Sequence, residues 1–427
     1  MITERLFQFI WQFQYFNKAH LQTIDGEQVE VISTGQFNYN QGPDFLNGRV
    51  RIGATILAGN IELHLTEADW TRHAHSNDPN YRNIILHVLW EHPGEARLSL
   101  PTISLKERVS KILLQRYDEL MRNNTFVPCL NSLHQVSALT WLKWKERLLA
   151  ERLIRKSALV LQYLHQCNQH WEEVLWWMLA RNFGIPINPE PFEAVARSLP
   201  LTIIARHRNH IHQLEALLLG QAGLLDKDFQ SNYARLLSTD YKFYSFKYQL
   251  NPIPQQVHFL RMRPQNFPTV RMAQLAMLLH NSTALFSQIK EAGTVKDLYA
   301  LLHVTASEYW NTHYLIDEPT ASRPKALGAQ MIENIIINTI VPMLFAYGHF
   351  RNEQRCKDKA LDWLEQLAPE KNTITNQWAA SGVLNEHAWD SQALIELKKE
   401  YCDVRRCLEC AVGSSLLRAK ENLCPVT

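Results

Sequence analysis

The sequence predicts an α+β protein in which a small N-terminal α/β domain with a mixed β-sheet is followed by a large all-α domain. Short β-branched segments separated by glycine and asparagine turns occupy residues 28–90. From about residue 106 the apolar residues recur at helical spacing. Glycine is sparse, at 15 in 427 residues, which favours helices over a barrel or sandwich for most of the chain. We therefore expect an α/β domain over 1–110 and a helical domain over 111–427.

Each expected element follows from local patterns. An amphipathic helix is predicted over 3–17, where apolar residues form one face. Period-two or β-branched segments between turn residues predict strands over 28–33, 49–52, 56–58, 60–65 and 83–90. Helical periodicity then predicts helices over 106–121, 140–164 and 171–182. A loop is predicted around the prolines at 186, 189 and 191.

Charge and apolar content bear on location and partners. The net charge is +2, which carries no global signal for a polyanion, and residues 1–110 hold 12 acidic against 9 basic residues. Any contact with DNA or RNA is therefore expected from the second domain. The most apolar run, 335–347, contains Asn338 and Pro342 and is shorter than the roughly 20 residues that cross a bilayer, so no membrane span is expected. Seven cysteines without an export signal predict a cytoplasmic protein.

The most informative motif combines Pro43-Asp44 with the segment Glu62-Leu63-His64. In a strand, side chains alternate between the two faces, so Glu62 and His64 share one face while Leu63 points into the core. A hairpin would bring Asp44, at the start of the preceding strand, beside Glu62. Two carboxylates in one pocket supply the oxygen ligands that Mg²⁺ prefers. The alternative is that Asp44 only caps a turn and that Glu62 and His64 form a solvated strand face.

The order helix, strand, Pro-Asp, strand and Glu-x-His resembles the PD-(D/E)xK nuclease superfamily. The resemblance implies a restriction-endonuclease-like core in which Asp44 and Glu62 hold Mg²⁺ or Mn²⁺, assisted by the carbonyl of Leu63. Glu4 would match an additional acidic residue of some members. The sequence departs from the motif at His64, where the superfamily has lysine; histidine is mostly neutral at pH 7 but is able to act as a base.

A different metal site is also compatible with the next segment. His73, His75 and Asp78 have acceptable spacing for Zn²⁺ or Mn²⁺ in a loop, and His87 follows in a strand. That site would belong to a hydrolase of a small substrate. Alternatively, these residues line the same cleft as Asp44, and His87 is a buried, hydrogen-bonded histidine.

Nearly the whole chain resembles a bacterial family, seen mainly in Bacteroidetes-type genomes, that is classed as a domain of unknown function. The resemblance implies a bacterial cytoplasmic protein and supplies no activity. It is carried by the segments Gly42–Phe45, Asp69-Trp70, His73-x-His75, Asp78, Tyr81, Ile85–Val88, Arg261–Pro264, Asn266–Thr269 and Cys402-x4-Cys407-x2-Cys410.

Four cysteines are grouped near the C-terminus, at Cys402, Cys407, Cys410 and Cys424. Their thiolates could hold Zn²⁺ or an iron–sulfur cluster. The spacing is not a standard ribbon or ferredoxin pattern, and buried free thiols in helices are the alternative.

Two groups of basic residues could contact anions. Lys145, Arg152 and Lys156 share one helical face, either as a phosphate-binding stripe or as a solvated charged face. Arginines at 261, 263 and 271 lie in or just after a proline-rich connection, where they suit anion recognition or ion pairing between helices.

These patterns predict a metal-dependent nuclease or phosphodiesterase acting on DNA or RNA, with Asp44 and Glu62 as metal ligands and His64 activating water. The alternative is a non-catalytic interaction protein built on a degenerate nuclease core, with a helical domain that binds a partner. The histidine at position 64 and the acidic balance of residues 1–110 favour that alternative.

Overall fold

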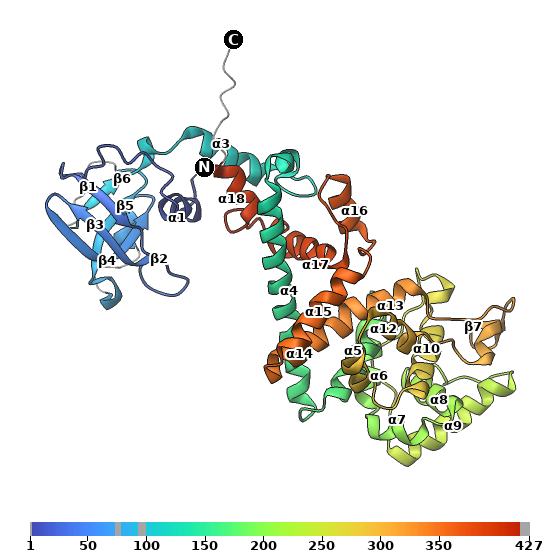
Figure 1. Ribbon diagram of the computed structural model, residues 1–427. Helices are drawn as coiled ribbons and strands as arrows, with labels where there is room; N and C mark the ends of the chain where they lie inside the picture. Colours follow the sequence, from blue (N-terminus) through green and yellow to red (C-terminus); the bar gives the residue numbers. More distant parts are fainter. Residues whose placement is uncertain (1, 73–77, 93–99, 419–427) are drawn as a thin grey trace, which may run out of the picture. The chain divides into compact units, whose positions relative to one another are not determined.

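The computed structural model describes residues 2–72, 78–92 and 100–418, and contacts divide the chain into two units (Figure 1). The first unit comprises residues 1–144 and 397–427, and the second comprises residues 145–396. The change of secondary structure expected near residue 110 therefore lies inside the first unit. Helix α3 (Lys111–Arg122) packs against the late helix α18 (Ala411–Arg418), which joins the C-terminal residues to the N-terminal ones.

The first unit is built on a curled mixed sheet with strand order β1-β3-β4-β5-β6, and β2 pairs with β3. The β1–β3 and β3–β4 pairs are antiparallel, whereas β4–β5 and β5–β6 are parallel. Helix α2 (Ala68–Arg72) lies between β4 and β5 in the sequence and is part of the crossover that parallel pairing requires. The strands are β1 Val29–Ser33, β2 Gln36–Phe37, β3 Phe45–Ile52, β4 Thr55–His64, β5 Ile84–Leu89 and β6 Thr102–Ser104.

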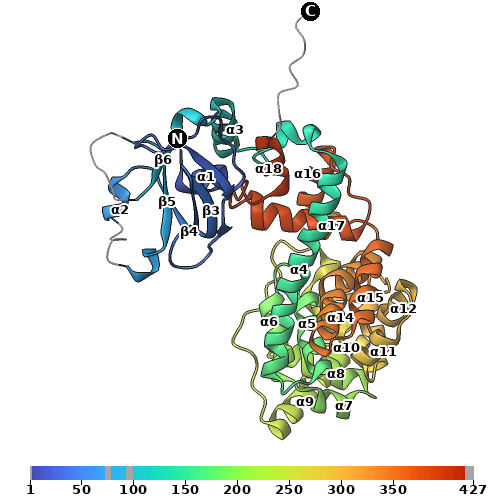
Figure 2. The same ribbon diagram turned by 60° about the vertical axis from the view of Figure 1, so that its left-hand side comes forward.

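Helix α1 (Glu4–Gln12) lies against the sheet and contacts β4 (Figure 2). Thr3 caps it, accepting a hydrogen bond from the backbone N–H of Leu6 at 3.2 Å. The helix is shorter than the 3–17 expected from its apolar face. Gln14 takes a left-handed backbone conformation (φ 53°), and Phe16 forms a β-bridge with Val109, so the chain after Gln12 leaves the helix.

The second unit is predominantly helical, which confirms the coarse prediction of a large helical region. Pro189 and Pro191 lie in the first turn of α6, where proline fits, and not in the loop that was expected there. The unit also contains a two-stranded hairpin, β7 (His313–Leu315) with β8 (Glu318–Pro319). Its helices, including α4 that crosses the boundary between units, are α4 Ala138–Gln166, α5 Trp171–Phe183, α6 Pro189–Ser198, α7 Leu201–His207, α8 Ile211–Gln221, α9 Asn232–Tyr248, α10 Pro268–Asn281, α11 Leu285–Glu291, α12 Val295–Leu302, α13 Ala329–Ile335, α14 Val341–Arg351, α15 Gln354–Gln366, α16 Thr373–Ala380 and α17 Ala388–Glu396.

One segment of the described residues, Ala329–Arg351, is long and apolar enough to cross a membrane by length and composition. It runs through α13 and α14 with a π-helical stretch, Ile336–Ile340, between them. Inside the second unit, 67% of its most apolar window is buried. The segment contacts α5 and α15, so most of its apolar side chains already have protein partners.

Candidate functional site

The first unit brings Asp44 and Glu62 together through reciprocal backbone contacts. Asp44 immediately precedes β3, and Phe45 pairs with Ile61 in the antiparallel β3–β4 register, which places Asp44 beside Glu62. The backbone N–H of Asp44 donates to Oε2 of Glu62 at 3.0 Å. The backbone N–H of Leu63 donates to Oδ2 of Asp44 at 3.1 Å. Each carboxylate is therefore fixed by the strand that carries the other.

The two carboxylates share an acidic environment in which Glu62 is buried and Asp44 is half-buried. Only 4% of Glu62 is exposed, and Gln8 of α1 donates to Oδ1 of Asp44 at 2.7 Å. Burial, followed by the charge of Glu4, raises the pKa of Asp44 to about 7. Burial, followed by the charge of Asp44, raises the pKa of Glu62 to about 9. Glu4 lies exposed at the first position of α1, and its charge acts on both carboxylates.

Two histidines continue the polar face of the sheet. His64 ends β4, and His87 lies opposite Glu62 in the parallel β4–β5 register. Nδ1 of His64 lies 2.9 Å from Nε2 of His87, which is a hydrogen bond whose direction depends on the tautomers. Nε2 of His64 lies 3.6 Å from Oε1 of Glu62. Both histidines are buried, at 2% and 0% exposure, so this face is not the solvated strand surface of the alternative interpretation.

Two aromatic side chains cover the polar face. Trp70 of α2 contacts the rings of His64 and His87 edge-on, with centroids 6.1 and 5.2 Å apart respectively. Tyr81, in the short helix Pro79–Tyr81, contacts Trp70 in turn. Burial, with the charges of Glu62 and Asp44, raises the pKa of the Tyr81 phenol, so its hydroxyl remains protonated beside the carboxylates.

The other metal residues predicted from the sequence have different outcomes. His73 and His75 lie outside the described residues. Asp78 caps the Pro79–Tyr81 helix, accepting from the backbone N–H of Asn80 at 2.9 Å. Throughout the ranges described, no group of three or more histidine, cysteine, aspartate or glutamate side chains is arranged as a ready metal site.

Two residues of this cluster, Gln8 and Tyr81, were not predicted as site residues from the sequence. Gln8 joins it because it follows Glu4 by one helical turn in α1, and Tyr81 joins it from a short loop helix. The only sequence clue is that Glu4 and Gln8 share a helix face.

The C-terminal cysteines gather with a cysteine from far earlier in the sequence. Burial raises the pKa values of Cys129 and Cys402, and the proximity of Cys410 raises both further, which places these cysteines near one another. Burial raises the pKa of Cys407 to about 12 and that of Cys410 to about 11, which keeps both as neutral thiols. Cys424 lies outside the described residues.

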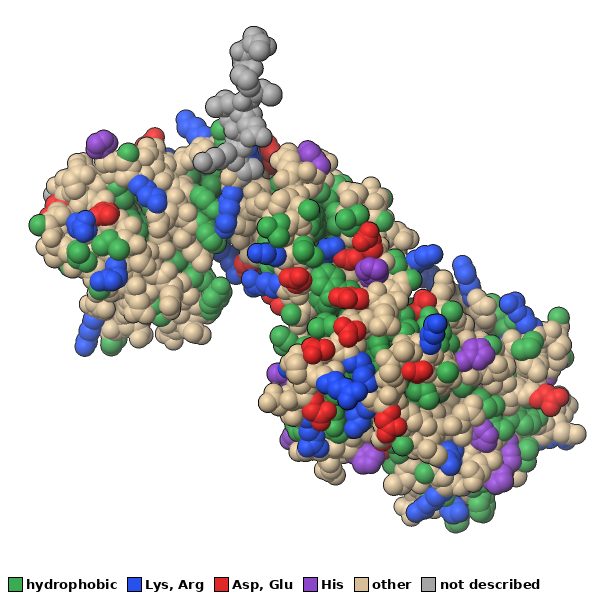
Figure 3. All heavy atoms as spheres, viewed as in Figure 1, with side chains coloured by type: hydrophobic (Ala, Val, Ile, Leu, Met, Phe, Trp, Pro, Cys, Tyr) green, Lys and Arg blue, Asp and Glu red, His purple; other side chains and the backbone are tan. Residues whose placement is uncertain are grey.

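The predicted basic stripe of α4 is an internal ion-pair network of the second unit. Lys145 pairs with Asp390, and Arg152 donates from Nη1 to Oε2 of Glu396 at 3.1 Å. Lys156 donates to Oδ1 of Asn338 at 2.8 Å. Lys145 and Arg152 form neither a phosphate-binding stripe nor a solvated face, because they are buried and paired with acidic side chains of α17. Lys156 is half-buried and is held by a neutral amide side chain. On the face viewed in Figure 3, basic side chains of this unit are interspersed with acidic ones.

The fold and the site define an α+β protein whose mixed sheet carries a buried carboxylate pair beside two histidines. Residues 4–373 match the family described as "Protein of unknown function (DUF2851)", and the chain belongs to this family. This confirms the predicted membership of a family of unknown function that spans nearly the full length. No curated protein and no solved structure matches the chain.

Proposed function

We propose that the first unit is a divalent-metal-dependent phosphodiester hydrolase core that acts on DNA or RNA. The observation that carries the proposal is the reciprocal arrangement of Asp44 and Glu62, which holds a half-buried and a buried carboxylate together. Ionising both without a counter-charge is unfavourable, as their raised pKa values indicate. A cation would supply the missing charge.

The two carboxylates supply the type of donor atom, oxygen, that Mg²⁺ and Mn²⁺ prefer. Both ions prefer carboxylate oxygens, and Mg²⁺ commonly takes one or two protein carboxylates and completes its shell with water and substrate phosphate. In this arrangement Asp44 and Glu62 are the ligands, with Glu4 at the edge of the site. A bound ion of this class would lower the pKa of a coordinated water and polarise a phosphoryl oxygen.

The sheet topology supports the proposed resemblance to PD-(D/E)xK nucleases. An antiparallel hairpin carries Pro43-Asp44 before β3 and Glu62-x-His64 at the end of β4. After α2 the chain returns as β5, parallel to β4. This is the element order that the sequence motif predicts for such a core.

The chain's own residues have distinct proposed roles. Asp44 and Glu62 bind the cation, and Gln8 orients Asp44 by donating to its Oδ1. His64 takes the position of the motif lysine, where its Nε2, 3.6 Å from Glu62, accepts a proton from the attacking water. His87 fixes the His64 ring through their hydrogen bond. Trp70 shields the two imidazoles from bulk water.

A non-catalytic interaction protein is the second candidate. Two observations favour it: the motif lysine is replaced by His64, and the described residues contain no ready group of three metal ligands. In that case the carboxylate cluster would remain as a protonated, hydrogen-bonded part of the core, and the helical unit would bind a partner.

Calorimetric titration with Mn²⁺ separates the two candidates. The wild-type chain is expected to bind Mn²⁺ at pH 8, and Glu62→Gln and Asp44→Asn are each expected to weaken binding at least about tenfold. Glu27→Gln changes an exposed acid of the same unit and is the matched control. Unchanged Mn²⁺ affinity in both site variants would exclude Asp44 and Glu62 as ligands and favour the interaction protein.

A further inference from the structure

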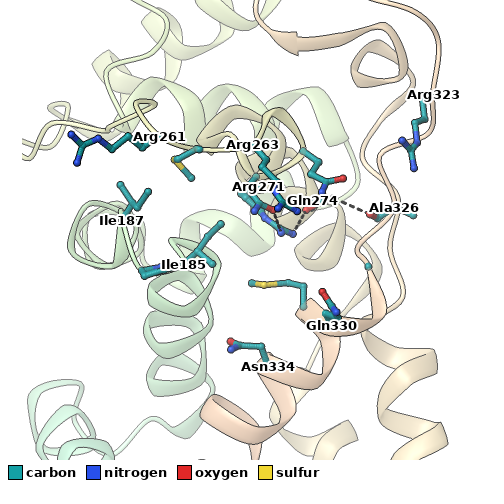
Figure 4. Close-up of a pocket in the computed structure, with 16 residues that line it drawn as sticks. Ile185, Ile187, Arg261, Arg263, Arg271, Gln274, Arg323, Ala326, Gln330 and Asn334 are labelled. Carbon is teal, nitrogen blue, oxygen red and sulfur yellow. Dashed lines mark hydrogen bonds between the residues drawn. The ribbon is translucent and has the colours of Figure 1, made fainter. Parts of the chain in front are cut away.

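The second unit contains a cavity of about 640 Å³ with an unusual lining (Figure 4). Four arginines line it, and the lining contains several Asn and Gln side chains and no Asp or Glu. Figure 4 shows Arg263 and Arg271 close together beside Gln274, with Asn334 across from them, and Arg261 and Arg323 on opposite sides of the view. The loop before α10, α10 itself, the segment between β8 and α13, and α13 supply these residues.

Arg271 is built into the wall of the cavity without a carboxylate partner. Its side chain donates to Oε1 of Gln274 at 2.9 Å and to Oδ1 of Asn266 at 2.6 Å, which are both neutral acceptors. Gln274 is held in turn by the carbonyl of Lys325, at 3.0 Å from its Nε2. Only 7% of Arg271 is exposed, and its Nε has no hydrogen-bond partner. A buried guanidinium in this state is costly unless an anion approaches it.

The residues around Arg271 add positive charge to the cavity wall and supply no negative charge that would cancel it. Lys325 is buried behind the wall, and its Nζ donates to the carbonyls of Asn311 and Arg323 at 3.2 and 2.9 Å. Within the part of the chain that the structure describes, no Asp or Glu pairs with Arg261, Arg263, Arg271 or Arg323. The ion pairing between helices that the sequence left open for the first three is therefore not what these residues do.

We propose that this cavity binds the phosphate of a nucleotide, either free or at the end of a nucleic-acid strand. Guanidinium groups match phosphate oxygens through paired N–H donors, and four arginines line this one cavity, two of them close together. The volume falls in the range of sites for small organic ligands and is larger than phosphate alone requires. Amide side chains and the apolar Ile185, Ile187 and Met262 supply contacts for a base and sugar. The proposal does not depend on catalysis at Asp44 and Glu62.

Binding measurements with three probes test the proposal and distinguish a free nucleotide from the end of a nucleic-acid strand. Inorganic phosphate, ATP and a short 5′-phosphorylated single-stranded DNA would be titrated into the full-length chain. ATP or the oligonucleotide is expected to bind more tightly than phosphate, with an affinity that falls as salt rises. Tighter binding of ATP identifies a free nucleotide as the ligand, and tighter binding of the oligonucleotide identifies a strand end. Binding of phosphate alone, or of none of the three, would overturn the proposal.

Variants place the binding in the cavity. Arg263→Gln and Arg323→Gln change exposed positions of the lining and are each expected to weaken binding by about tenfold. Arg271→Gln is expected to weaken it further, although this buried change also tests folding. Arg206→Gln, an exposed arginine of α7 outside the lining, is the control and is expected to bind as wild type. Equal affinity in Arg263→Gln, Arg323→Gln and wild type would refute the site. Glu62→Gln should leave this affinity unchanged, so failure of the proposed hydrolase and failure of this site are distinguishable.

Discussion

Replacing Glu62 by Gln is predicted to stabilise the first unit at pH 8 and to remove part of its pH dependence. The folded-state pKa of Glu62 is raised from 4.5 to about 9. The folded unit therefore binds this proton more tightly than the unfolded chain does. The contribution of protonated Glu62 to the free energy of unfolding is fully present below pH 4.5 and is lost as the pH rises toward 9. Gln keeps the hydrogen-bond acceptor for the backbone N–H of Asp44 and carries no charge.

The size of the effect follows from the same shift. The interval from pH 5 to pH 8 lies between the two pKa values and covers about 3 pH units. Each unit lowers the free energy of unfolding of the wild type by about 1.4 kcal/mol, which gives an upper limit of about 4 kcal/mol. Hydration and rearrangement of the ionised side chain reduce such penalties, so we expect about 2 kcal/mol. For a unit of this size that corresponds to roughly 4–8 °C in Tm.

The assay is calorimetric unfolding at pH 5 and pH 8, with the transition of the first unit identified by hydrogen exchange in β3 and β4. Mg²⁺ at about 100 times its Kd is expected to raise the stability of the wild-type unit at pH 8 by about 2.7 kcal/mol and that of Glu62→Gln much less. Glu27→Gln should behave as wild type. If Glu62→Gln showed the wild-type dependence on both pH and Mg²⁺, the reasoning about this carboxylate pair would be wrong.

Three further predictions concern other parts of the chain. Asp390→Ala leaves Lys145 buried without its partner and is expected to lower the free energy of unfolding of the second unit by about 3–5 kcal/mol, as measured with urea. Adding Lys145→Met should restore much of that loss. Burial raises the pKa of Glu215 to about 7, so the second unit should lose stability from pH 4.5 to pH 7, and Glu215→Gln should flatten that loss in the same measurement. Because burial raises the pKa values of Cys407 and Cys410, both should react with iodoacetamide at pH 8 far more slowly than Cys167, as followed by mass spectrometry.

A specific outcome would contradict each of these three predictions. An undiminished loss in the Lys145→Met double variant would mean that Asp390 stabilises the unit through other contacts. A pH profile unaltered by Glu215→Gln would remove that group as the source of the pH dependence. Rapid alkylation of Cys407 or Cys410 in the folded protein would contradict their burial as neutral thiols.

The sequence was sufficient to place the carboxylate pair, because strand alternation and a Pro-Asp turn are local rules. These rules put Glu62 and His64 on one face and Asp44 at the start of the adjacent strand, and the structure has this arrangement. They do not show what covers that face, since Trp70 and Gln8 arrive from separate helices. Local alternation alone therefore left a solvated strand open as an alternative.

Long-range ion pairing explains why neither interpretation of the basic residues of α4 was correct. Helical spacing correctly puts Lys145 and Arg152 on one face of α4, but their partners Asp390 and Glu396 lie more than 200 residues later. No local pattern reveals that pairing. For the same reason Cys129 could not be assigned to the C-terminal cysteines from spacing. The arginine cavity differs in part, since its first three arginines are near one another in the sequence. The cavity itself, the contribution of Arg323 and the absence of acidic residues from the lining required the structure.

The central claim is that Asp44 and Glu62 hold a divalent cation for phosphodiester hydrolysis. The most direct test is cleavage of single- and double-stranded DNA and RNA by the full-length chain with Mg²⁺ or Mn²⁺, compared with Glu62→Ala. Cleavage by the wild type is expected to require the metal and to be lost in the variant. Metal-dependent cleavage that persists at the wild-type rate in Glu62→Ala, or no cleavage of any of these substrates by the wild type, would contradict the claim.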